Sequence, residues 1–245
     1  MTARGSFAIA ALAFQATLLP LPALAQTDRV PSAVVPAGQS SPLISRRTAM
    51  VAGLLFGAAL MGDRGLREGA QEFRGGTTNT MAKLGNTLGE WRYVVPALSA
   101  GYLAGEISGS SDLKRVMLHA GAAAALATGI SSSLKYTIGR NRPPVAGDPA
   151  QFRPFSGSNS FPSGHTAVAF ALATSIADET DDKWSDVALY GAATLTAMSR
   201  INDDRHWASD VIIGGLIGHL SGRWVSKQMG PVRVVPGAVT VNLEF

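Results

Sequence analysis

The sequence predicts an all-α fold, a bundle of helices with a small β-hairpin at its C-terminal end. The apolar runs are rich in Ala and Gly, and aromatic residues make up only 7 % of the chain, which favours helices that pack closely. Polar, Gly-rich or Pro-rich breaks separate the runs, as expected between helices. The apolar or helical runs are residues 49–61, 91–107, 113–134, 167–177, 187–198 and the segment that follows residue 210.

The composition allows one domain with a substantial core and excludes cysteine chemistry. The chain has 245 residues, of which 46 % are hydrophobic, enough for a sizeable core. Without Cys there is no disulfide framework, Cys-ligated zinc site or catalytic thiol. The net charge of +4 and a pI near 9.7 suit anionic lipid, a phosphate substrate or nucleic acid. Because no nucleic-acid-binding motif is visible and the basic residues are not interleaved with aromatic ones, we expect no nucleic-acid partner.

The N-terminal region has the features of an export signal followed by a linker. Arg4 precedes an apolar stretch over 7–19 and a small-residue end at 23–25, which predicts a signal peptide over residues 1–25. The alternative is an uncleaved N-terminal anchor. Residues 26–47 contain three prolines and are interpreted as an extended linker. The main domain is then expected over 48–230.

Two segments of the chain depart from the helical pattern. Residues 62–90 are polar and Gly-rich, and the run Gly75-Gly76-Thr77-Thr78-Asn79 indicates a loop. Residues 231–245 alternate with a period of two around Pro236-Gly237, which predicts the β-hairpin.

Three features inside the expected helices are interpreted as packing features. Gly214, Gly218 and Gly222 recur at intervals of four and would permit close helix contact. His119 and His219 are each assigned to packing within a helix.

The segment 199–210 carries the first candidate site. His206 and Asp210 are four residues apart, so a helix that began near His206 would place them on one face. The carboxylate could then accept the Nδ1–H of the imidazole and leave Nε2 free to attack an electrophile. Arg200 lies just upstream, where it could hold an anion in front of that nitrogen. A surface pair or a helix cap is the ordinary alternative for such a spacing.

The second candidate segment follows the helix expected over 113–134. Lys135 ends that helix, and Pro143 pushes Arg142 out of helical geometry and stops it. Both side chains could point at one anion. A basic helix C-terminus that complements the helix dipole is the alternative.

The third candidate segment is Pro162-Ser163-Gly164-His165. Ser163 is well placed to cap the helix that follows, and the free N–H groups of a helix start bind phosphate readily. Gly164 would let the backbone approach a ligand closely. His165 lies at that position, where it could donate a proton; an ordinary capped helix with a surface histidine is the alternative.

Taken together, the three segments resemble the type 2 phosphatidic acid phosphatase (PAP2) superfamily, which also includes bacterial acid phosphatases and haloperoxidases. The pattern Lys-x6-Arg-Pro matches Lys135 through Pro143, and Pro-Ser-Gly-His matches 162–165. The pattern Ser-Arg-x5-His-x3-Asp matches 199–210. The resemblance covers roughly residues 90–225, the motif core, and implies a PAP2-type bundle with its active site at one end.

The resemblance implies a metal-independent phosphatase that hydrolyses phosphomonoesters or lipid phosphates and pyrophosphates through a phosphohistidine. His206 would attack phosphorus, Asp210 would orient it, and His165 would protonate the leaving oxygen and then activate water. With cations to neutralise the phosphate, no metal or other cofactor is expected, which agrees with the physics of phosphoryl transfer. The implied phosphate-binding groups are Lys135, Arg142, Ser163, Gly164 and Arg200.

The site is expected in the periplasm. The continuous apolar runs are shorter than the ~20 residues that a membrane span needs. If six helices spanned the bilayer after a cleaved signal peptide, the site would face the cytoplasm, which conflicts with export. We therefore expect a soluble or membrane-associated periplasmic domain acting on a phosphorylated small molecule or lipid, with a membrane surface as a further partner. The alternative is an integral inner-membrane protein whose site faces the periplasm.

Two further functions are compatible with the same residues. One is a vanadate-dependent haloperoxidase-like enzyme, since vanadate can replace phosphate in such a pocket. The other is a non-catalytic envelope protein that only binds anionic headgroups. Pure binding needs no nucleophile, so the complete set of His165, His206 and Asp210 favours an enzyme.

Overall fold

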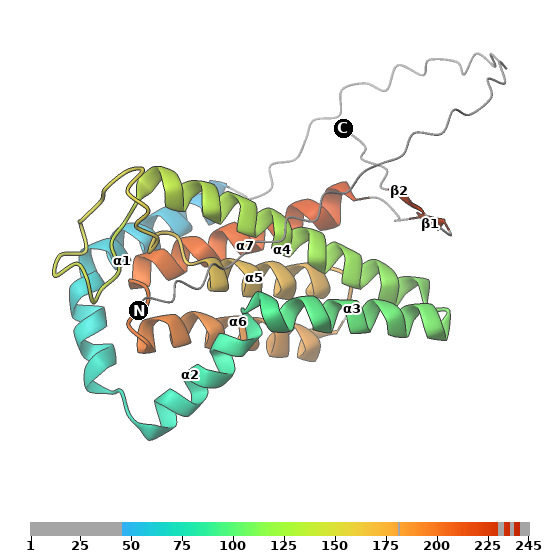
Figure 1. The fold of residues 1–245 in the computed structure, drawn as a ribbon, viewed down its shortest axis with the longest axis horizontal. Coiled ribbons are helices and arrows are strands. Elements are labelled where there is room, and N and C mark those ends of the chain that lie inside the picture. The colour runs from blue at the N-terminus through green and yellow to red at the C-terminus, as the bar shows by residue number, and fades with distance from the viewer. Residues whose placement is uncertain (1–45, 181, 230–232, 236–237, 241–245) are drawn as a thin grey trace, which may run out of the picture. The chain divides into compact units, whose positions relative to one another are not determined.

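The computed structural model describes residues 46–180, 182–229, 233–235 and 238–240. The predicted signal peptide and most of the predicted linker lie outside these residues. Figure 1 shows the helices and strands of the described part. They are α1 (Arg46–Glu72), α2 (Gly76–Leu88), α3 (Trp91–Ser108), α4 (Ser111–Ile138), α5 (Gly164–Ala177), α6 (Lys183–Asn202), α7 (Ala208–Gln228), β1 (Arg233–Val235) and β2 (Ala238–Thr240).

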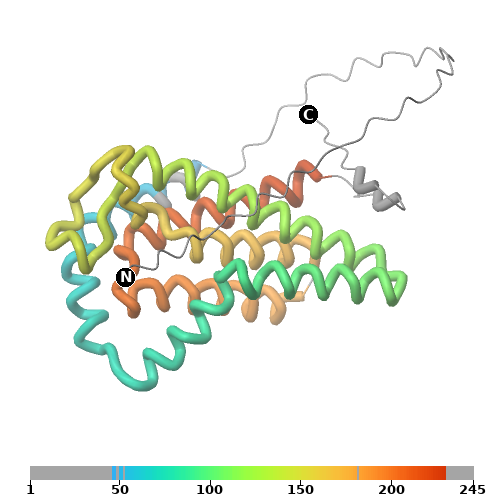
Figure 2. The backbone as a smooth tube through the Cα atoms, in the orientation of Figure 1, coloured from blue at the N-terminus to red at the C-terminus, as the bar shows by residue number. Residues whose placement is uncertain are grey.

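Helix α5 is the central element of the all-α bundle. It packs against α4, α6 and α7, while α3 covers α4, α2 covers α6 and α1 covers the start of α7 (Figure 1). Figure 2 shows that the long α4–α5 connection and the α6–α7 turn lie at the same end of the helices. Segments that are far apart in the sequence therefore meet at this end.

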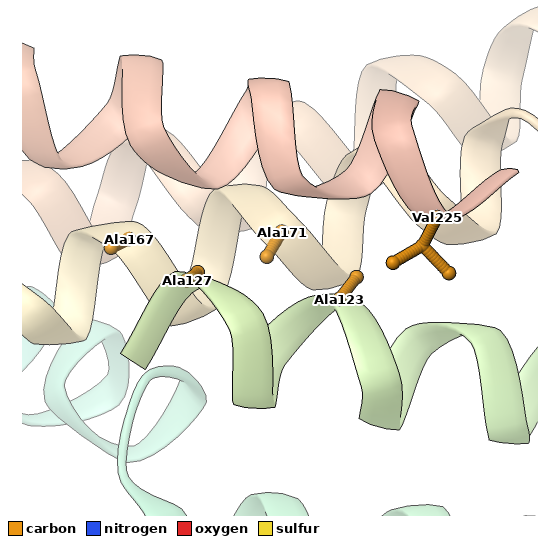
Figure 3. Close-up of a cluster of buried hydrophobic side chains, with 5 residues drawn as sticks. All are labelled: Ala123, Ala127, Ala167, Ala171 and Val225. Carbon is orange, nitrogen blue, oxygen red and sulfur yellow. The ribbon is translucent and has the colours of Figure 1, made fainter. Parts of the chain in front are cut away.

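Small side chains form the core between α4, α5 and α7. Ala123, Ala127, Ala167 and Ala171 are completely buried, and Val225 of α7 closes the cluster (Figure 3). Because Ala projects little beyond the backbone, the helices approach closely, as the Ala-rich runs of the sequence predict.

The glycine stripe of α7 is confirmed as a packing feature. A Cβ atom at Gly214 would lie 2.5 Å from the carbonyl oxygen of Ser163, which is too close for any non-glycine residue. Gly218 and Gly222 abut the backbone of α5 in the same way. The stripe therefore packs α7 closely along α5, and Gly214 lies against the Pro-Ser-Gly-His segment at its start.

Helix α4 ends for a reason other than the one expected. It continues past Lys135 to Ile138 and stops at Gly139, whose φ of 62° is left-handed. Glycine adopts this conformation at little cost, so it terminates the helix before Pro143 can act. Lys135 is consequently in the last turn of α4 rather than at its end.

The expected irregular stretch over 62–90 is mostly helical. Helix α1 continues to Glu72, and α2 begins at Gly76 inside the run that indicated a loop. The backbone N–H of Gly75 donates to Oγ1 of Thr78 at 2.9 Å, a helix-start contact that the local glycines obscured in the sequence. Helix α2 then lies on α6, where Oγ1 of Thr196 donates to the carbonyl of Gly85 at 2.9 Å.

Two features bear on the remaining fold predictions. Strands β1 and β2 pair antiparallel over the three residues of each, but most of residues 231–245 lie outside the described part, so the hairpin as a whole stays a prediction. Among the described helices, α4 is long and apolar enough to cross a membrane by length and composition, and a third of its apolar window is buried.

Candidate active site

His206 lies in the turn between α6 and α7, and its ring is almost completely buried. Helix α7 begins only at Ala208, so the predicted arrangement of His206 and Asp210 on one helical face is wrong. Instead, Asp210 occupies the first turn of α7 and accepts the backbone N–H of Trp207 at 3.0 Å. Nδ1 of His206 is enclosed and 3.6 Å from Oδ2 of Asp210, slightly beyond hydrogen-bond distance.

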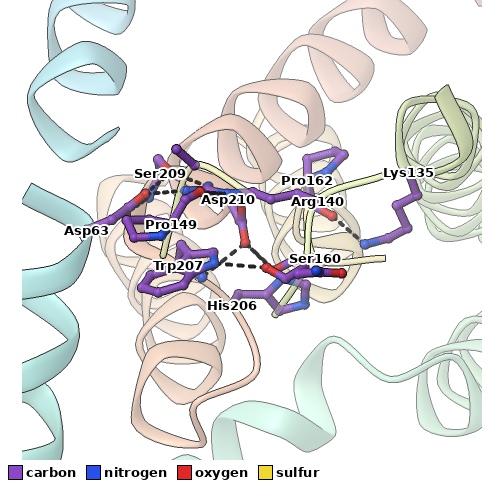
Figure 4. Close-up of polar contacts among 12 residues, drawn as sticks. Asp63, Lys135, Arg140, Pro149, Ser160, Pro162, His206, Trp207, Ser209 and Asp210 are labelled. Atoms are coloured by element: carbon purple, nitrogen blue, oxygen red, sulfur yellow. Dashed lines mark hydrogen bonds and ion pairs between the residues drawn. The ribbon is translucent and has the colours of Figure 1, made fainter. Parts of the chain in front are cut away.

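The carboxylate of Asp210 is held on both oxygens. Oδ1 accepts Nη1 of Arg140 at 2.6 Å, and Oδ2 accepts the hydroxyl of Ser160 at 2.5 Å (Figure 4). The side chains of Asp210 and Arg140 are fully buried. These donors leave the carboxylate one orientation, with Oδ2 toward the imidazole of His206.

A second buried carboxylate, Asp63 of α1, extends this network. Nη2 of Arg140 donates to Asp63 at 2.7 Å, and Asp63 also accepts the backbone N–H and the hydroxyl of Ser209 at 2.9 and 2.6 Å (Figure 4). The guanidinium of Arg140 is also within 5.3 Å of the Phe152 ring and 5.5 Å of the Trp207 ring. A completely buried ion triad therefore links α1, the α4–α5 connection and the start of α7.

Lys135 and the start of α5 form the next part of the site. Nζ of Lys135 donates to the carbonyls of Asn159 at 2.8 Å and Pro162 at 2.5 Å. Ser163 is the N-cap residue of α5, as predicted, but its hydroxyl is paired with that of Thr166 at 2.9 Å rather than with the helix backbone. A Cβ at Gly164 would lie 3.7 Å from Cε of Lys135, so the ammonium stem passes directly over this glycine.

A polar pocket of about 440 Å³ opens beside these groups. It contains three of the predicted site residues, Arg142, His165 and Arg200. His206, Asp210, Lys135, Ser163 and Gly164 are outside its immediate lining. The other lining residues are Lys83, Asn86, Thr87, Glu90, Arg92, Tyr93, Asp203 and Arg205.

The two pocket arginines have donors without partners. Nε of Arg142 and Nε of Arg200 are enclosed, and neither has a hydrogen bond among the described residues. Nη1 of Arg200 donates to Oδ1 of Asn86, which fixes the guanidinium against α2. Buried guanidinium N–H groups without partners are costly.

Burial sets the charge state of the two histidines. Burial lowers the pKa of His206 from 6.5 to about 4, and the charges of Lys135 and Arg200 act in the same direction. The imidazole is therefore neutral and can act as a nucleophile at neutral pH. Burial and the charge of Arg200 also lower the pKa of His165, against the opposing effect of Glu90.

Sequence reasoning missed the supporting carboxylates and their partners. Arg140 is inside the unspecified part of Lys-x6-Arg-Pro, where a third basic residue was the available signal. Asp63 and Glu90 belong to the stretch interpreted as irregular, which offered no signal. Ser160 and Ser209 adjoin motif residues, and only the fold shows that they face Asp210 and Asp63.

Two histidines, each beside a carboxylate, and a pocket whose lining includes several arginines are the features on which an anion-binding site can be proposed. Residues 116–233 match the family described as the PAP2 superfamily. This part of the chain belongs to the superfamily.

A curated relative agrees with this membership. The chain is 42 % identical over 107 residues to the lipid A 1-phosphatase of Porphyromonas gingivalis, a match that covers 42 % of this chain and 22 % of that protein. The chain thus spans about a fifth of the length of this relative.

The solved structures share the fold. LpxE from Aquifex aeolicus superimposes with a TM-score of 0.56 at 24 % identity, covering 67 % of this chain and 94 % of that one. A transmembrane PAP2-type phosphatidylglycerolphosphate phosphatase from Bacillus subtilis superimposes with a TM-score of 0.54 at 20 % identity, covering 73 % and 94 %. At these identities the likeness concerns the helical architecture.

Proposed function

We propose that the protein is a metal-independent phosphatase that hydrolyses the phosphomonoester of a lipid through a phosphohistidine on His206. The observation that carries the proposal is the pocket lined by Arg142, His165 and Arg200, with His206 beside it in the α6–α7 turn, where its backbone N–H donates to the carbonyl of Arg200. Membership of the PAP2 superfamily supports it. Lys135, Ser163 and Gly164 belong to the same proposed phosphate-binding set, at the start of α5.

In the first step, Nε2 of His206 attacks phosphorus and forms a P–N bond while the bond to the leaving oxygen breaks. His165 gives a proton to that oxygen, so an alcohol departs. Asp210 stabilises the positive charge that develops on the His206 ring. The guanidinium groups of Arg142 and Arg200 stabilise the charge on the equatorial oxygens, which is the main source of catalysis in phosphoryl transfer.

In the second step, water replaces the histidine. His165, now neutral, takes a proton from the water as its oxygen attacks phosphorus. The P–N bond breaks, inorganic phosphate forms, and His206 regains its neutral imidazole. A general acid and base of this kind contributes about 10²–10⁴ in rate.

The surroundings of the pocket support a lipid substrate. A mainly apolar groove of about 350 Å³ along α3, α4 and α5 shares Thr87 and Tyr93 with the basic pocket. The relative from P. gingivalis is named for lipid A, which carries a phosphate beside acyl chains. A lipid phosphate would therefore place its charge in the basic pocket and apolar chain along this groove.

Exposed apolar side chains support a location at a membrane. Met61 of α1 is 86 % exposed, and Ile107 of α3 is 88 % exposed. Together with the apolar α4, these surfaces would be covered by a bilayer. Because a signal peptide is predicted over residues 1–25, we expect the protein on the periplasmic side. Flotation with lipid vesicles after alkaline extraction tests the association; full recovery in the soluble fraction would contradict it.

The substitution His206→Ala tests the chemistry. We expect the purified variant to lose p-nitrophenyl phosphate hydrolysis by about 10⁴-fold or more, because no other group can form the intermediate. Quenching turnover with alkaline denaturant should trap a base-stable, acid-labile phosphoryl label in the wild type and none in the variant.

A matched control separates this effect from loss of structure. His219→Ala removes a half-buried histidine whose Nδ1 is 3.1 Å from Oγ1 of Thr174, away from the pocket. It should keep wild-type turnover within a few-fold. Full activity of His206→Ala with a wild-type melting profile would reject the mechanism.

A further inference from the structure

Glu90 is a pocket residue to which the mechanism above assigns no task. It is the N-cap residue of α3, and its Oε2 lies 3.2 Å from Nε2 of His165. Both side chains are about one-third exposed, so the contact lies at the pocket wall rather than in the core. A carboxylate beside an imidazole fixes which ring nitrogen carries a proton.

The backbone on both sides of this contact is tightly placed. A Cβ at Gly89 would lie 2.7 Å from the carbonyl oxygen of His165, so the start of α3 rests directly on the start of α5. Nε1 of Trp91 donates to Oγ1 of Thr128 at 3.2 Å and anchors the next residue of α3 to α4. Glu90 therefore extends from a fixed backbone position toward the imidazole.

The charges around His165 oppose its protonated form. Glu90 and Asp203 are the carboxylates of the pocket. Asp203 already accepts Nδ2 of Asn86 at 2.6 Å and Nδ2 of Asn202 at 3.1 Å, whereas the described hydrogen bond of Glu90 is to His165. The positive charges of Arg200 from α6 and Lys135 from α4 act on His165. The basic residues that line the same pocket are Lys83 from α2, Arg92 from α3, Arg142 from the α4–α5 connection, Arg200, and Arg205 from the α6–α7 turn.

We propose that Glu90 is a positioning residue that holds the Nε2–H of His165 and keeps the ring protonated, so that Nδ1–H faces the leaving oxygen. This inference rests on the proposed function. Nδ1 has no hydrogen bond within the described part of the chain, and it is the nitrogen left for substrate. The proton passes from Nδ1 to the leaving oxygen as its bond to phosphorus breaks, and the ring, still bound to Glu90 through Nε2–H, becomes neutral.

The dependence on the leaving group tests this assignment. Nitrophenolate leaves without much help from an acid, whereas an alkoxide needs a proton. We expect Glu90→Gln to lower kcat/KM for an alkyl phosphate by about 10- to 100-fold, part of the general-acid contribution, and to change p-nitrophenyl phosphate hydrolysis by less than about threefold. In the dependence of kcat/KM on pH for the alkyl phosphate, the fall on the alkaline side should move to lower pH. Equal losses on both substrates, or no loss on either, would overturn the proposal.

Two further variants complete the experiment. Glu106→Gln removes a carboxylate from the other end of α3, where it pairs with Lys114 at 3.0 Å, and should leave both substrates unaffected. Glu90→Asp keeps the charge and should retain more of the alkyl phosphate rate than Glu90→Gln; equal losses would count against the role of the charge.

A measurement independent of turnover separates this inference from the proposed function. The Cε1–H resonance of His165, assigned by comparison with His165→Asn, should titrate at lower pH in Glu90→Gln than in the wild type. An unchanged titration would overturn the role of Glu90. Absence of hydrolysis by the wild type on either substrate would instead reject the proposed function, whatever the titration shows.

Discussion

The two histidines of the site have opposite surroundings. The side chain of His206 is 3 % exposed, and the side chain of its partner Asp210 is fully buried and held by Arg140 and Ser160. His165 is 31 % exposed, and its partner Glu90 is 33 % exposed at the wall of an open pocket. One imidazole–carboxylate pair is enclosed in the protein, and the other faces solvent.

The difference corresponds to the two tasks proposed for these histidines. A nucleophile must stay neutral and aimed at phosphorus. Burial keeps His206 neutral, and the carboxylate beside it is held in place by Arg140 and Ser160. A general acid and base must exchange its proton with a departing alcohol and an arriving water, so it needs access to the pocket. The comparison predicts that substitutions around the enclosed pair, His206 and Asp210, lower stability and activity together. Substitutions around the open pair, His165 and Glu90, should lower activity alone.

The largest effect is expected from Arg140→Met. This substitution leaves Asp63 and Asp210 as two buried carboxylates without their shared cation, which should cost about 3–5 kcal/mol of unfolding free energy. Turnover should fall as well, because Asp210 loses one of the two side-chain donors that orient it. Urea unfolding and p-nitrophenyl phosphate assays measure the two effects.

The control for this variant is Arg223→Met. Arg223 pairs with Asp178 at 2.7 Å but is 39 % exposed, so its loss should cost less than about 1 kcal/mol. If Arg140→Met lost as little unfolding free energy as Arg223→Met, the buried surroundings of His206 and Asp210 would not be the more sensitive part of the site.

A smaller effect of the same kind is expected from Asp63→Asn. The amide keeps the size of the side chain and can still accept from Ser209, but Arg140 then has one carboxylate partner instead of two. We expect a loss of about 1–3 kcal/mol and a several-fold loss of turnover, measured as above. Asp112→Asn, at a highly exposed carboxylate in the first turn of α4, should change neither. A neutral Asp63→Asn would show that α1 only covers the site.

The pH dependence distinguishes the two histidines directly. For the free enzyme, kcat/KM should fall below about pH 4 as His206 becomes charged, and should fall on the alkaline side at a pKa below 6.5 as His165 loses its proton. A pH series of initial rates at low substrate concentration measures both limbs. His165→Asn should remove the fall in kcat/KM on the alkaline side. If that fall persists in the variant, another group causes it.

Stability should depend on pH through His206 with a definite sign. Its pKa in the folded protein lies below that of the unfolded chain, so the unfolded state binds the proton more readily. The stabilisation is present above pH 6.5 and is lost as the pH falls toward 4. His206→Asn should therefore lose less melting temperature over this range than the wild type, and an equal loss would contradict the burial of a neutral imidazole.

The smallest effect is expected from Lys83→Ala at the rim of the pocket. This exposed side chain attracts the anion through solvent, so KM should rise by roughly 1.5- to 5-fold without a change in kcat, and the rise should shrink at high salt. Lys227→Ala, at an exposed site in the last turn of α7, serves as the control. A loss of kcat in Lys83→Ala would mean that Lys83 contributes to turnover as well as to attraction of the anion.

The helical architecture and the motif residues could be read from the sequence because both depend on local spacing. Ala-rich and Gly-spaced runs indicated closely packed helices, and the glycines of α7 do abut α5. Ser163 was recognised as the N-cap of α5. The roles of His206, His165, Asp210 and the phosphate-binding residues remain predictions that the variants above test.

The errors arose where local signals conflicted with tertiary packing. Glycines around residue 76 indicated a loop, yet α2 begins there and packs against α6, with Ala82 and Gly85 buried. The spacing of His206 and Asp210 suggested a shared helical face, yet His206 precedes α7 and approaches Asp210 from the turn. The periodicity of hydrophobic residues does not predict at which residue α2 or α7 begins.

The sequence by itself determined the helical class, the family resemblance and the candidate residues for the chemistry, since these follow from residue type and spacing. Only the tertiary structure decided which carboxylates support them. Asp63 reaches Arg140 across 77 positions and Glu90 reaches His165 across 75. Contacts between residues so far apart leave no periodic signal, because the packing of helices, and not the local chain, brings them together.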